Sequence, residues 1–197
     1  TIDNKTVTVP EGTTILDAAL ANGIYIPHLC HHEDLHENGG CRLCVVKVEG
    51  CYEVLTACST MAKEGMVVNT KDEEVEDIRK LSMDLMFSTH PGECVGCPKY
   101  GKCQLASILQ YQGDTGRQLR DMRIKVAAEE TNPLMLHEMY RCILCGRCVR
   151  ACQELRGVGA LKFDKVDGRM RVVVNGDSLE EAGCKFCGAC VEVCPTG

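Results

Sequence analysis

Aromatic side chains are scarce in this chain of 197 residues, which contains no Trp, three Phe and five Tyr. A chain of this length normally buries several large rings, and such rings supply much of the packing energy of a core. We therefore expect that something other than a large aromatic core helps to hold the chain together.

Long apolar runs and an excess of positive charge are also missing. No stretch approaches about 18 consecutive apolar residues, so we expect no direct membrane insertion. The N-terminus, which begins at Thr1, lacks the basic and then apolar pattern of a secretory signal. The chain has 22 Lys and Arg against 28 Asp and Glu, and this acidic balance argues against binding to nucleic acid.

Cysteine, in contrast, is abundant, with 16 residues. Without a secretory signal we expect a reducing, cytoplasmic location, where disulfides are rare and thiolates bind metals instead. All of the cysteines but one fall into four groups along the chain. Cys51 fits no group, and we interpret it as a free, half-buried thiol.

The strongest signal is a cysteine pattern that occurs twice. Each copy is C-x2-C-x2-C-x3-C, and Pro195 follows the second copy. This is the ligand run of bacterial ferredoxins, in which the fourth cysteine of each run serves the other [4Fe–4S] cluster. Zinc suits the spacing poorly, because zinc sites use two well-separated cysteine pairs. The predicted ligand sets are Cys142, Cys145, Cys148 and Cys194 for one cluster, and Cys184, Cys187, Cys190 and Cys152 for the other.

The first group favours a [2Fe–2S] cluster, which needs four thiolates from one loop region. Its members are Cys30, Cys41, Cys44 and Cys58. The first gap is longer than in the plant-type spacing, and zinc is a more serious rival here because histidines crowd the same loop. We interpret these histidines as mostly solvated loop residues: His28, His31, His32 and His36.

The middle group has only three cysteines, Cys94, Cys97 and Cys103. A [4Fe–4S] cluster calls for a fourth ligand, and His90 lies four residues before Cys94. From the spacing alone two interpretations stand. Either His90 is that ligand, or it is a turn residue and the fourth position is open.

Local patterns predict a small α/β unit over residues 1–79. Alternating residues predict a strand over 6–9, and a helix capped by Thr13 or Thr14 follows. Further strands are expected over 44–48, 52–56 and 66–70. This order of strand, helix, metal loop and strands is typical of a β-grasp domain.

Helical periodicity follows over 72–90, and a second helix is expected over 100–112. We expect one apolar stripe of the first helix to face the core: Val75, Ile78, Leu81, Leu85 and Met86. A basic segment forms either a solvated face or a docking site for an acidic partner: Arg117, Arg120, Arg123 and Lys125. A turn at 131–133 predicts a boundary, and strands are expected over 163–166 and 170–174.

Together these motifs resemble the N-terminal iron–sulfur region shared by the large subunit of respiratory NADH dehydrogenase, multi-subunit iron-only hydrogenases and NAD-dependent formate dehydrogenases. The resemblance covers essentially the whole chain. In that family the first loop holds a [2Fe–2S] cluster on a plant-type ferredoxin fold. The string H-x3-C-x2-C-x5-C holds a His-ligated [4Fe–4S] cluster, which implies that His90 is a ligand. Two full ferredoxin runs are more similar to the hydrogenase and formate dehydrogenase branches.

The expected fold is α+β in three domains. Residues 1–79 form a plant-type ferredoxin-like β-grasp domain with one [2Fe–2S] cluster. Residues 80–130 form a small helical segment with the His90 and three-cysteine [4Fe–4S] cluster. Residues 131–197 form a bacterial ferredoxin-like domain with two further [4Fe–4S] clusters.

The sequence shows no catalytic substrate site. No G-x-G-x-x-G string follows a predicted strand, and no nucleophile and base stand apart from the candidate ligands. We therefore expect an iron–sulfur electron-transfer subunit. The resemblance implies a flavoprotein partner that reacts with NAD(P)(H), and a further redox subunit; whether such a complex is electron-bifurcating is left open.

Two other functions are kept as alternatives. The chain could be the electron-input region of a catalytic hydrogenase or formate dehydrogenase subunit whose active-site domain is absent here. It could also be a structural scaffold stapled by zinc.

Overall fold

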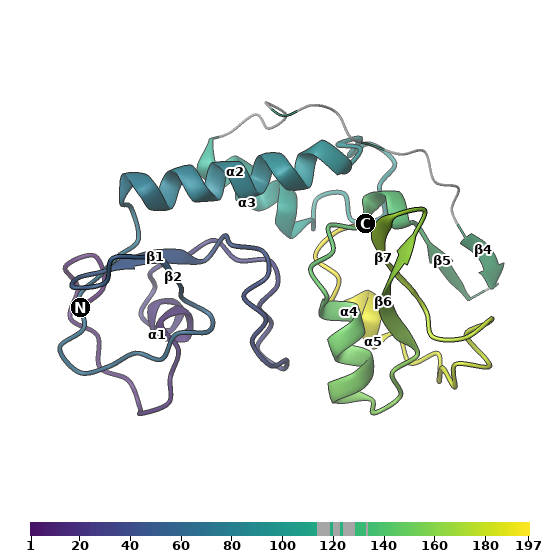
Figure 1. The fold of residues 1–197 in the computed structure, drawn as a ribbon, viewed down its shortest axis with the longest axis horizontal. Coiled ribbons are helices and arrows are strands. Elements are labelled where there is room, and N and C mark those ends of the chain that lie inside the picture. The colour runs from purple at the N-terminus through teal and green to yellow at the C-terminus, as the bar shows by residue number, and fades with distance from the viewer. Residues whose placement is uncertain (114–118, 120–122, 124–128, 133) are drawn as a thin grey trace.

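The computed structural model describes residues 1–113, 119, 123, 129–132 and 134–197. An N-terminal part and a C-terminal part lie side by side, purple to blue and green to yellow in Figure 1. The long helix α2 (Glu73–Thr89) runs over the N-terminal part toward the C-terminal part. Helix and sheet are mixed, and the sheets are small. Among the described residues, no helix is both long and apolar enough to cross a membrane.

One helix and a three-stranded antiparallel sheet form the N-terminal part, with strand order β2-β1-β3. Its elements are α1 (Ile15–Ala21), β1 (Val45–Val48), β2 (Leu55–Thr56) and β3 (Val68–Asn69). Helix α1 begins where predicted because the Thr14 hydroxyl accepts a hydrogen bond from the Asp17 backbone N–H at 3.1 Å. The predicted strands are confirmed, although β2 and β3 are shorter than expected. Ile15 and Leu16 are fully buried against the sheet.

The predicted strand over 6–9 is wrong, because these residues form no strand. Asp3 and Asn4 turn the chain at φ values of 45° and 65°. As a result, Ile2 and Lys5 exchange both of their backbone hydrogen bonds at 2.9 Å. The backbone groups of Ile2 and Lys5 are therefore not available to start strand pairing with a neighbour. Val7 and Val9 pack against the core without strand pairing.

Helix α2 confirms the predicted helix, but its predicted core-facing stripe is wrong in part. Leu81 and Leu85 are each 53% exposed. The buried face instead recurs every fourth residue, at Val75, Arg79, Met83 and Phe87. A charged residue therefore stands in the middle of the face that packs on the sheet, which an apolar-periodicity argument cannot anticipate.

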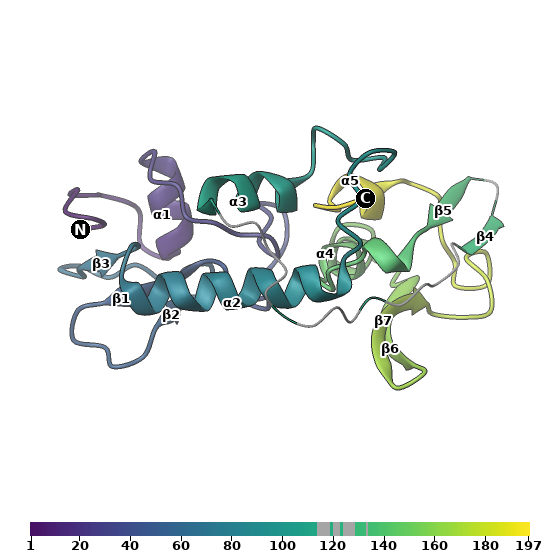
Figure 2. The same cartoon turned by 90° about the horizontal axis from the view of Figure 1, so that it is seen from above.

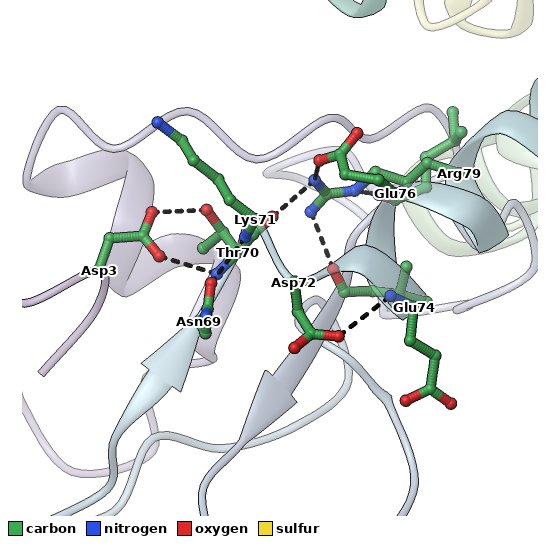
Figure 3. Close-up of polar contacts among 10 residues, drawn as sticks. Asp3, Asn69, Thr70, Lys71, Asp72, Glu74, Glu76 and Arg79 are labelled. Carbon is green, nitrogen blue, oxygen red and sulfur yellow. Dashed lines mark hydrogen bonds and ion pairs between the residues drawn. The ribbon is translucent and has the colours of Figure 1, made fainter.

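Arg79 explains the orientation of α2. It is 2% exposed, and its guanidinium donates hydrogen bonds to the backbone carbonyl oxygens of Leu43, Thr70 and Val45 at 2.8–2.9 Å. Figure 3 shows this guanidinium between the Glu76 carboxylate, 2.9 Å away, and the ends of the strands. Burial of an arginine is stabilising only when its donors are paired, and here the strand ends pair them.

The second predicted helix is confirmed as α3 (Gln104–Gln112), which ends at Gly113 with φ 66°. Leu105 and Ile108 of α3 join Met83 and Phe87 of α2 in one buried apolar cluster. Figure 2 shows α3 lying beside α2. Of the predicted basic segment, only Arg123 lies among the described residues, and its side chain donates to the Pro91 carbonyl oxygen at 3.0 Å.

The C-terminal part contains short helices and two hairpins. Its elements are β4 (Glu129–Asn132), β5 (Met135–His137), the 3-10 turn η1 (Met139–Arg141), α4 (Arg147–Arg150), the π-helical turn η2 (Ala151–Leu155), β6 (Leu161–Val166), β7 (Arg169–Val174) and α5 (Ala189–Glu192). The strands predicted between the repeat copies are confirmed as β6 and β7. They meet at Asp167 and Gly168, whose positive φ values of 52° and 76° suit a tight hairpin turn. Residues 131 and 132 of the predicted turn at 131–133 belong instead to β4, which pairs with β5, and residue 133 lies outside the described residues.

Candidate metal centres

The first cysteine group is gathered in the N-terminal part, and all four of its thiols are buried. The four side chains are close neighbours, since Cys30 acts on the pKa of Cys41 and Cys58, and Cys44 acts on the pKa of Cys58. The contact with Cys30 lowers the pKa of Cys58. The contact with Cys44 and burial outweigh that effect and raise the pKa to about 12. The contact with Cys30 and burial also raise the pKa of Cys41. The thiols of Cys41 and Cys58 therefore hold their protons tightly at neutral pH, and a metal must displace these protons in order to bind.

Backbone N–H groups point at the sulfurs of this group. The N–H of Gly39 lies against Cys58 and that of Leu43 against Cys41, and each lowers the pKa of the thiol that it contacts. Gly39 and Arg42 have φ values of 62° and 55°. These left-handed residues turn the loop so that its amides face inward, toward the place where thiolate charge would develop.

In the C-terminal part, the last cysteine of each run lies near cysteines of the other run. Cys194 lies beside the first run, where its charge raises the pKa of Cys142 and Cys145. Burial is the larger cause of these shifts, and the pKa values reach about 12 for Cys142 and about 11 for Cys145. In the second run, burial and then Cys152 raise the pKa of Cys190. Each run therefore has the fourth cysteine of the other run as its neighbour.

The two runs share one backbone conformation. Leu144 and Phe186 have φ values of 57° and 48°, and the glycines two residues further on have 76° and 75°. In both runs the N–H of the first of these residues donates to the first cysteine sulfur, at 3.3 Å for Leu144 and 3.4 Å for Phe186. Gly146 and Gly188, which directly follow Cys145 and Cys187, are the N-cap residues of α4 and α5, and their positive φ turns the chain into each helix. The sequence repeat is thus a structural repeat.

The middle group is more open. Cys94 is exposed, and Cys97 and Cys103 are half-buried. Burial, and then the charges of Cys97 and Cys94, raise the pKa of Cys103, so these three sulfurs are electrostatic neighbours. His90 is buried at the end of α2, where its Nδ1 accepts a hydrogen bond from the Gly92 N–H at 3.1 Å. Its ring packs edge-on against Phe87, with the centroids 6.0 Å apart.

The C-terminal residues connect the middle group to the ferredoxin-like runs. Gln104 N–H donates to the Pro195 carbonyl oxygen at 3.0 Å. Gly197 lies so close to the Cys97 sulfur that a β-carbon at this position would clash with it. The side chain of Thr196 donates to the Arg141 carbonyl oxygen at 3.3 Å. The segment after Cys194 is therefore packed directly on the middle group.

A single apolar cluster borders three of the four groups. Its buried members are Leu29, Cys30, Cys41, Leu43, Met83, Phe87, Leu105 and Ile108. Cys103 of the middle group and Cys145 of the third group pack against it. The first, middle and third groups thus lie around one water-excluding core rather than in separate units.

Three side chains that sequence reasoning missed join the first loop to the third group. Arg147 and Arg150 donate to the carbonyl oxygens of His31 and Cys30, respectively. Asn38 donates to the Cys145 carbonyl oxygen at 3.3 Å. The sequence signal for this link was that Arg147 and Arg150 lie between the cysteines of the first ferredoxin run, at positions where the ferredoxin pattern requires no particular residue.

The loop histidines are not all solvated as predicted. His31 is buried and lies 3.2 Å from the Asp17 carboxylate, and the Nδ1–H of His28 donates to the Ile26 carbonyl oxygen at 2.8 Å. Burial lowers the pKa of both rings. His36 is exposed, as expected. Within the ranges that the structure describes, no three His, Cys, Asp or Glu side chains converge as they would around a single metal ion.

Cys51 is also placed differently from the prediction. It is exposed rather than half-buried, and it follows β1, on the same surface as Lys47, Tyr52 and Glu74. No other cysteine neighbours it among these surface residues. The expectation that it belongs to none of the four groups agrees with this position.

Comparison with known families matches three segments of the chain. Residues 1–73 match a 2Fe-2S iron-sulfur cluster binding domain, and residues 79–115 match the NADH-ubiquinone oxidoreductase-G iron-sulfur binding region. Residues 141–197 match a 4Fe-4S dicluster domain. The chain therefore contains one 2Fe-2S domain and 4Fe-4S domains, in the order in which the cysteine groups occur.

Curated relatives share this arrangement over the whole chain. The alpha subunit of an NADPH-Fe(3+) oxidoreductase of Geobacter sulfurreducens is 37% identical over 100% of the chain and 23% of its own length. The mitochondrial 78 kDa subunit of NADH-ubiquinone oxidoreductase of Neurospora crassa is 33% identical over 100% of the chain and 26% of its own length. NADP-reducing hydrogenase subunit HndD of Solidesulfovibrio fructosivorans is 36% identical over 100% of the chain and 35% of its own length. The chain thus spans between about a quarter and about a third of these relatives.

A solved structure extends the similarity to three dimensions. The crystal structure of an NAD+-reducing [NiFe]-hydrogenase in the H2-reduced state has a chain that superposes with a TM-score of 0.82 at 32% identity. The match covers 90% of this chain and 74% of that one. The cysteine geometry, the matched domains and these relatives lead to one conclusion. The chain is an iron–sulfur electron-transfer region and belongs to the family of iron–sulfur subunits found in NADH dehydrogenases and NAD(P)-linked hydrogenases.

Proposed function

We propose that the chain relays single electrons through one [2Fe–2S] and three [4Fe–4S] clusters. The four ligand sets are Cys30, Cys41, Cys44 and Cys58 for the [2Fe–2S] cluster; His90, Cys94, Cys97 and Cys103; Cys142, Cys145, Cys148 and Cys194; and Cys184, Cys187, Cys190 and Cys152. The observation that carries the proposal is that Cys194 lies near Cys142 of the first run and Cys152 near Cys190 of the second, which supports an exchange of fourth cysteines. That exchange is the ligand arrangement of two-cluster ferredoxins.

The donor sets suit such clusters chemically. The cysteines are buried in the first set and mostly half-buried in the others, and backbone N–H groups of Gly39, Leu144 and Phe186 point at sulfurs of these sets. Hydrogen bonds to sulfur and exclusion of water are two of the means by which a protein adjusts a cluster's potential. The clusters, when bound, accept and donate one electron at a time. The chain supplies the thiolates, the amides and the dry surroundings.

We assign the clusters to three segments. Residues 1–79 carry the [2Fe–2S] cluster in a β-grasp unit of the plant-type ferredoxin kind, a proposal supported by α1 packed on the sheet β2-β1-β3. Residues 80–130 carry the His90 set, and residues 131–197 carry the two ferredoxin-like sets. The apolar cluster between the first, middle and third groups supports a relay along these segments, since short separations favour electron transfer.

A partner subunit is part of the proposal. A nicotinamide transfers two electrons as a hydride, whereas a cluster accepts one, so a flavin must stand between them. We propose that a flavoprotein that reacts with NAD(P)(H) carries that flavin and that a further redox subunit takes the electrons. The chain alone is therefore expected to show no dye reduction with NADH, and activity should need the flavoprotein. Activity of the isolated chain would contradict this division of labour.

Metal analysis tests the cluster content. The proposal requires about fourteen irons for each chain, with matching sulfide and no zinc. A zinc-stapled scaffold would give zinc, no iron and a colourless protein. The two outcomes exclude each other in the anaerobically purified protein, where oxygen cannot remove the iron first.

A second candidate function follows from the length of the relatives. Since the chain spans 23% and 35% of two of them, it is also suited to be the electron-input region of a longer catalytic subunit. The intact mass of the natural protein decides between the two: a polypeptide of 21.6 kDa supports a separate relay subunit, and a much larger one supports an input region.

A further inference from the structure

Arg147 occupies a singular position between two of the proposed ligand sets. It lies between Cys145 and Cys148 in the chain, and it is 3% exposed. One guanidinium nitrogen donates to the carbonyl oxygen of His31, the residue after Cys30. The other terminal nitrogen donates to the carbonyl oxygen of Val193, the residue before Cys194, at 3.3 Å. One buried cation therefore spans the loops of the first set and of the Cys142 set.

No carboxylate of the described residues is close enough to balance this charge. In the described part of the chain, no Asp or Glu lies within ion-pair distance of Arg147. The groups whose negative form would act on it most strongly are thiols of the two sets, Cys145, Cys30 and Cys41. Its Nε is buried and has no hydrogen-bond partner among the described residues. Burial lowers the pKa of Arg147, but a guanidinium stays protonated in proteins.

Other buried or half-buried arginines of the chain have a carboxylate nearby. Arg79 lies 2.9 Å from Glu76, and Arg141 lies 3.3 Å from Glu138. Arg150, one turn after Arg147, has the Glu154 carboxylate in its electrostatic neighbourhood. A buried charge without a counter-charge is costly, so an arginine left in this state indicates that its counter-charge is supplied by something else.

We propose that Arg147 is a positioning residue whose guanidinium serves as the shared counter-cation of the [2Fe–2S] cluster and of the neighbouring [4Fe–4S] cluster held by Cys142, Cys145, Cys148 and Cys194. Reduction adds one negative charge to a cluster, and a positive charge in a water-excluding region stabilises that reduced state. Arg147 therefore raises the potentials of both clusters together. This inference rests on the proposed function, since it needs both clusters to be present.

The test compares three variants of the anaerobically purified holoprotein by redox titration followed by electron paramagnetic resonance. Arg147→Gln removes the charge, and Arg147→Lys keeps it while changing the hydrogen-bond geometry. Arg150→Gln is the matched control, because it also removes a bond to the first loop but removes a charge that Glu154 offsets. We expect Arg147→Gln to lower the equilibrium constant for reduction about tenfold at both clusters, which is about 59 mV for a one-electron couple. Arg147→Lys and Arg150→Gln should stay close to the wild type.

Each outcome decides the matter. Equal potentials in the wild type and in an iron-replete Arg147→Gln protein would overturn the inference, as would a shift at only one of the two clusters. If Arg147→Gln fails to load its clusters while Arg147→Lys loads them, the charge is required and the inference stands. If neither loads, the side chain is a hydrogen-bond scaffold and the inference fails. A wild-type protein without iron would instead refute the proposed function itself.

Discussion

The backbone N–H of Gln104 donates a hydrogen bond to the carbonyl oxygen of Pro195 at 3.0 Å. These two residues directly follow Cys103 and Cys194, so the bond links the middle cysteine group to the set around Cys142. The link is made by backbone atoms, and it therefore depends on how the chain is folded rather than on which side chains it carries. It holds two ligand-bearing segments side by side although about ninety residues of chain separate them.

The exchange of fourth cysteines can be tested by replacing Cys194. In Cys194→Ala, the set of Cys142, Cys145 and Cys148 loses its fourth thiolate and with it the cluster, and we expect iron to fall from about fourteen to about ten atoms per chain. The resonance signals that remain should include the cluster of the second run. Cys51→Ala is the control, because Cys51 is exposed and belongs to no set, and it should keep the full iron content. Loss of the second-run cluster instead would show that each run serves its own cluster.

Replacement of His90 tests the middle site. His90→Cys substitutes a negative thiolate for a neutral imidazole, which disfavours reduction, and the potential of one [4Fe–4S] cluster should fall by about 59 mV or more. The measurement is a redox titration of that cluster's resonance signal. His36→Cys, at an exposed loop histidine, should leave all potentials unchanged. An unaltered middle cluster in His90→Cys would mean that His90 is a turn residue.

Arg79 is expected to govern stability rather than electron transfer. Arg79→Met leaves three buried carbonyl oxygens without their donors, at Leu43, Val45 and Thr70, and we expect a loss of about 3 kcal/mol. For a chain of this size, that loss corresponds to a fall in the apparent melting temperature of roughly 6–12 °C. Lys80→Met, on the exposed side of the same helix, should change it by less than about 2 °C. Equal effects of the two changes would contradict this role.

Iron should be extracted more easily as the pH falls. Burial and neighbouring thiols raise the pKa of Cys58 and Cys142 to about 12 and of Cys145 to about 11 in the metal-free protein. Each of these groups must give up a proton to bind iron, so protons compete with the metal and the binding constant rises with pH. Anaerobic incubation with a chelator should therefore remove iron faster at about pH 6 than at about pH 8. A rate that rises with pH would contradict the sign of this argument.

Much of the site was accessible from the sequence because cluster ligation imposes fixed spacing on cysteines. The pairing of Cys194 with the first run follows from that spacing and stays a prediction, and Cys194 is an electrostatic neighbour of Cys142 and Cys145 in the structure. The strand predicted over 6–9 failed because a left-handed turn at Asp3 and Asn4 closes the local hydrogen bonds first. The buried face of α2 was misjudged because Arg79 is buried by polar contacts, which apolar periodicity does not register. Arg147 was overlooked for the same reason, since its partners are carbonyl oxygens far away in the chain.

The repeated loop around Leu144 and Phe186 has a consequence for assembly. In the proposed ligand sets, each half of the repeat supplies three thiols of one set and a single thiol of the other, so neither half would be a complete site on its own. A chain interrupted within the β6–β7 hairpin would be deficient at two positions at once. If these sets are correct, we expect maturation of this region to be an all-or-none event, in which the second inorganic centre can be inserted only when the architecture needed for the first already exists.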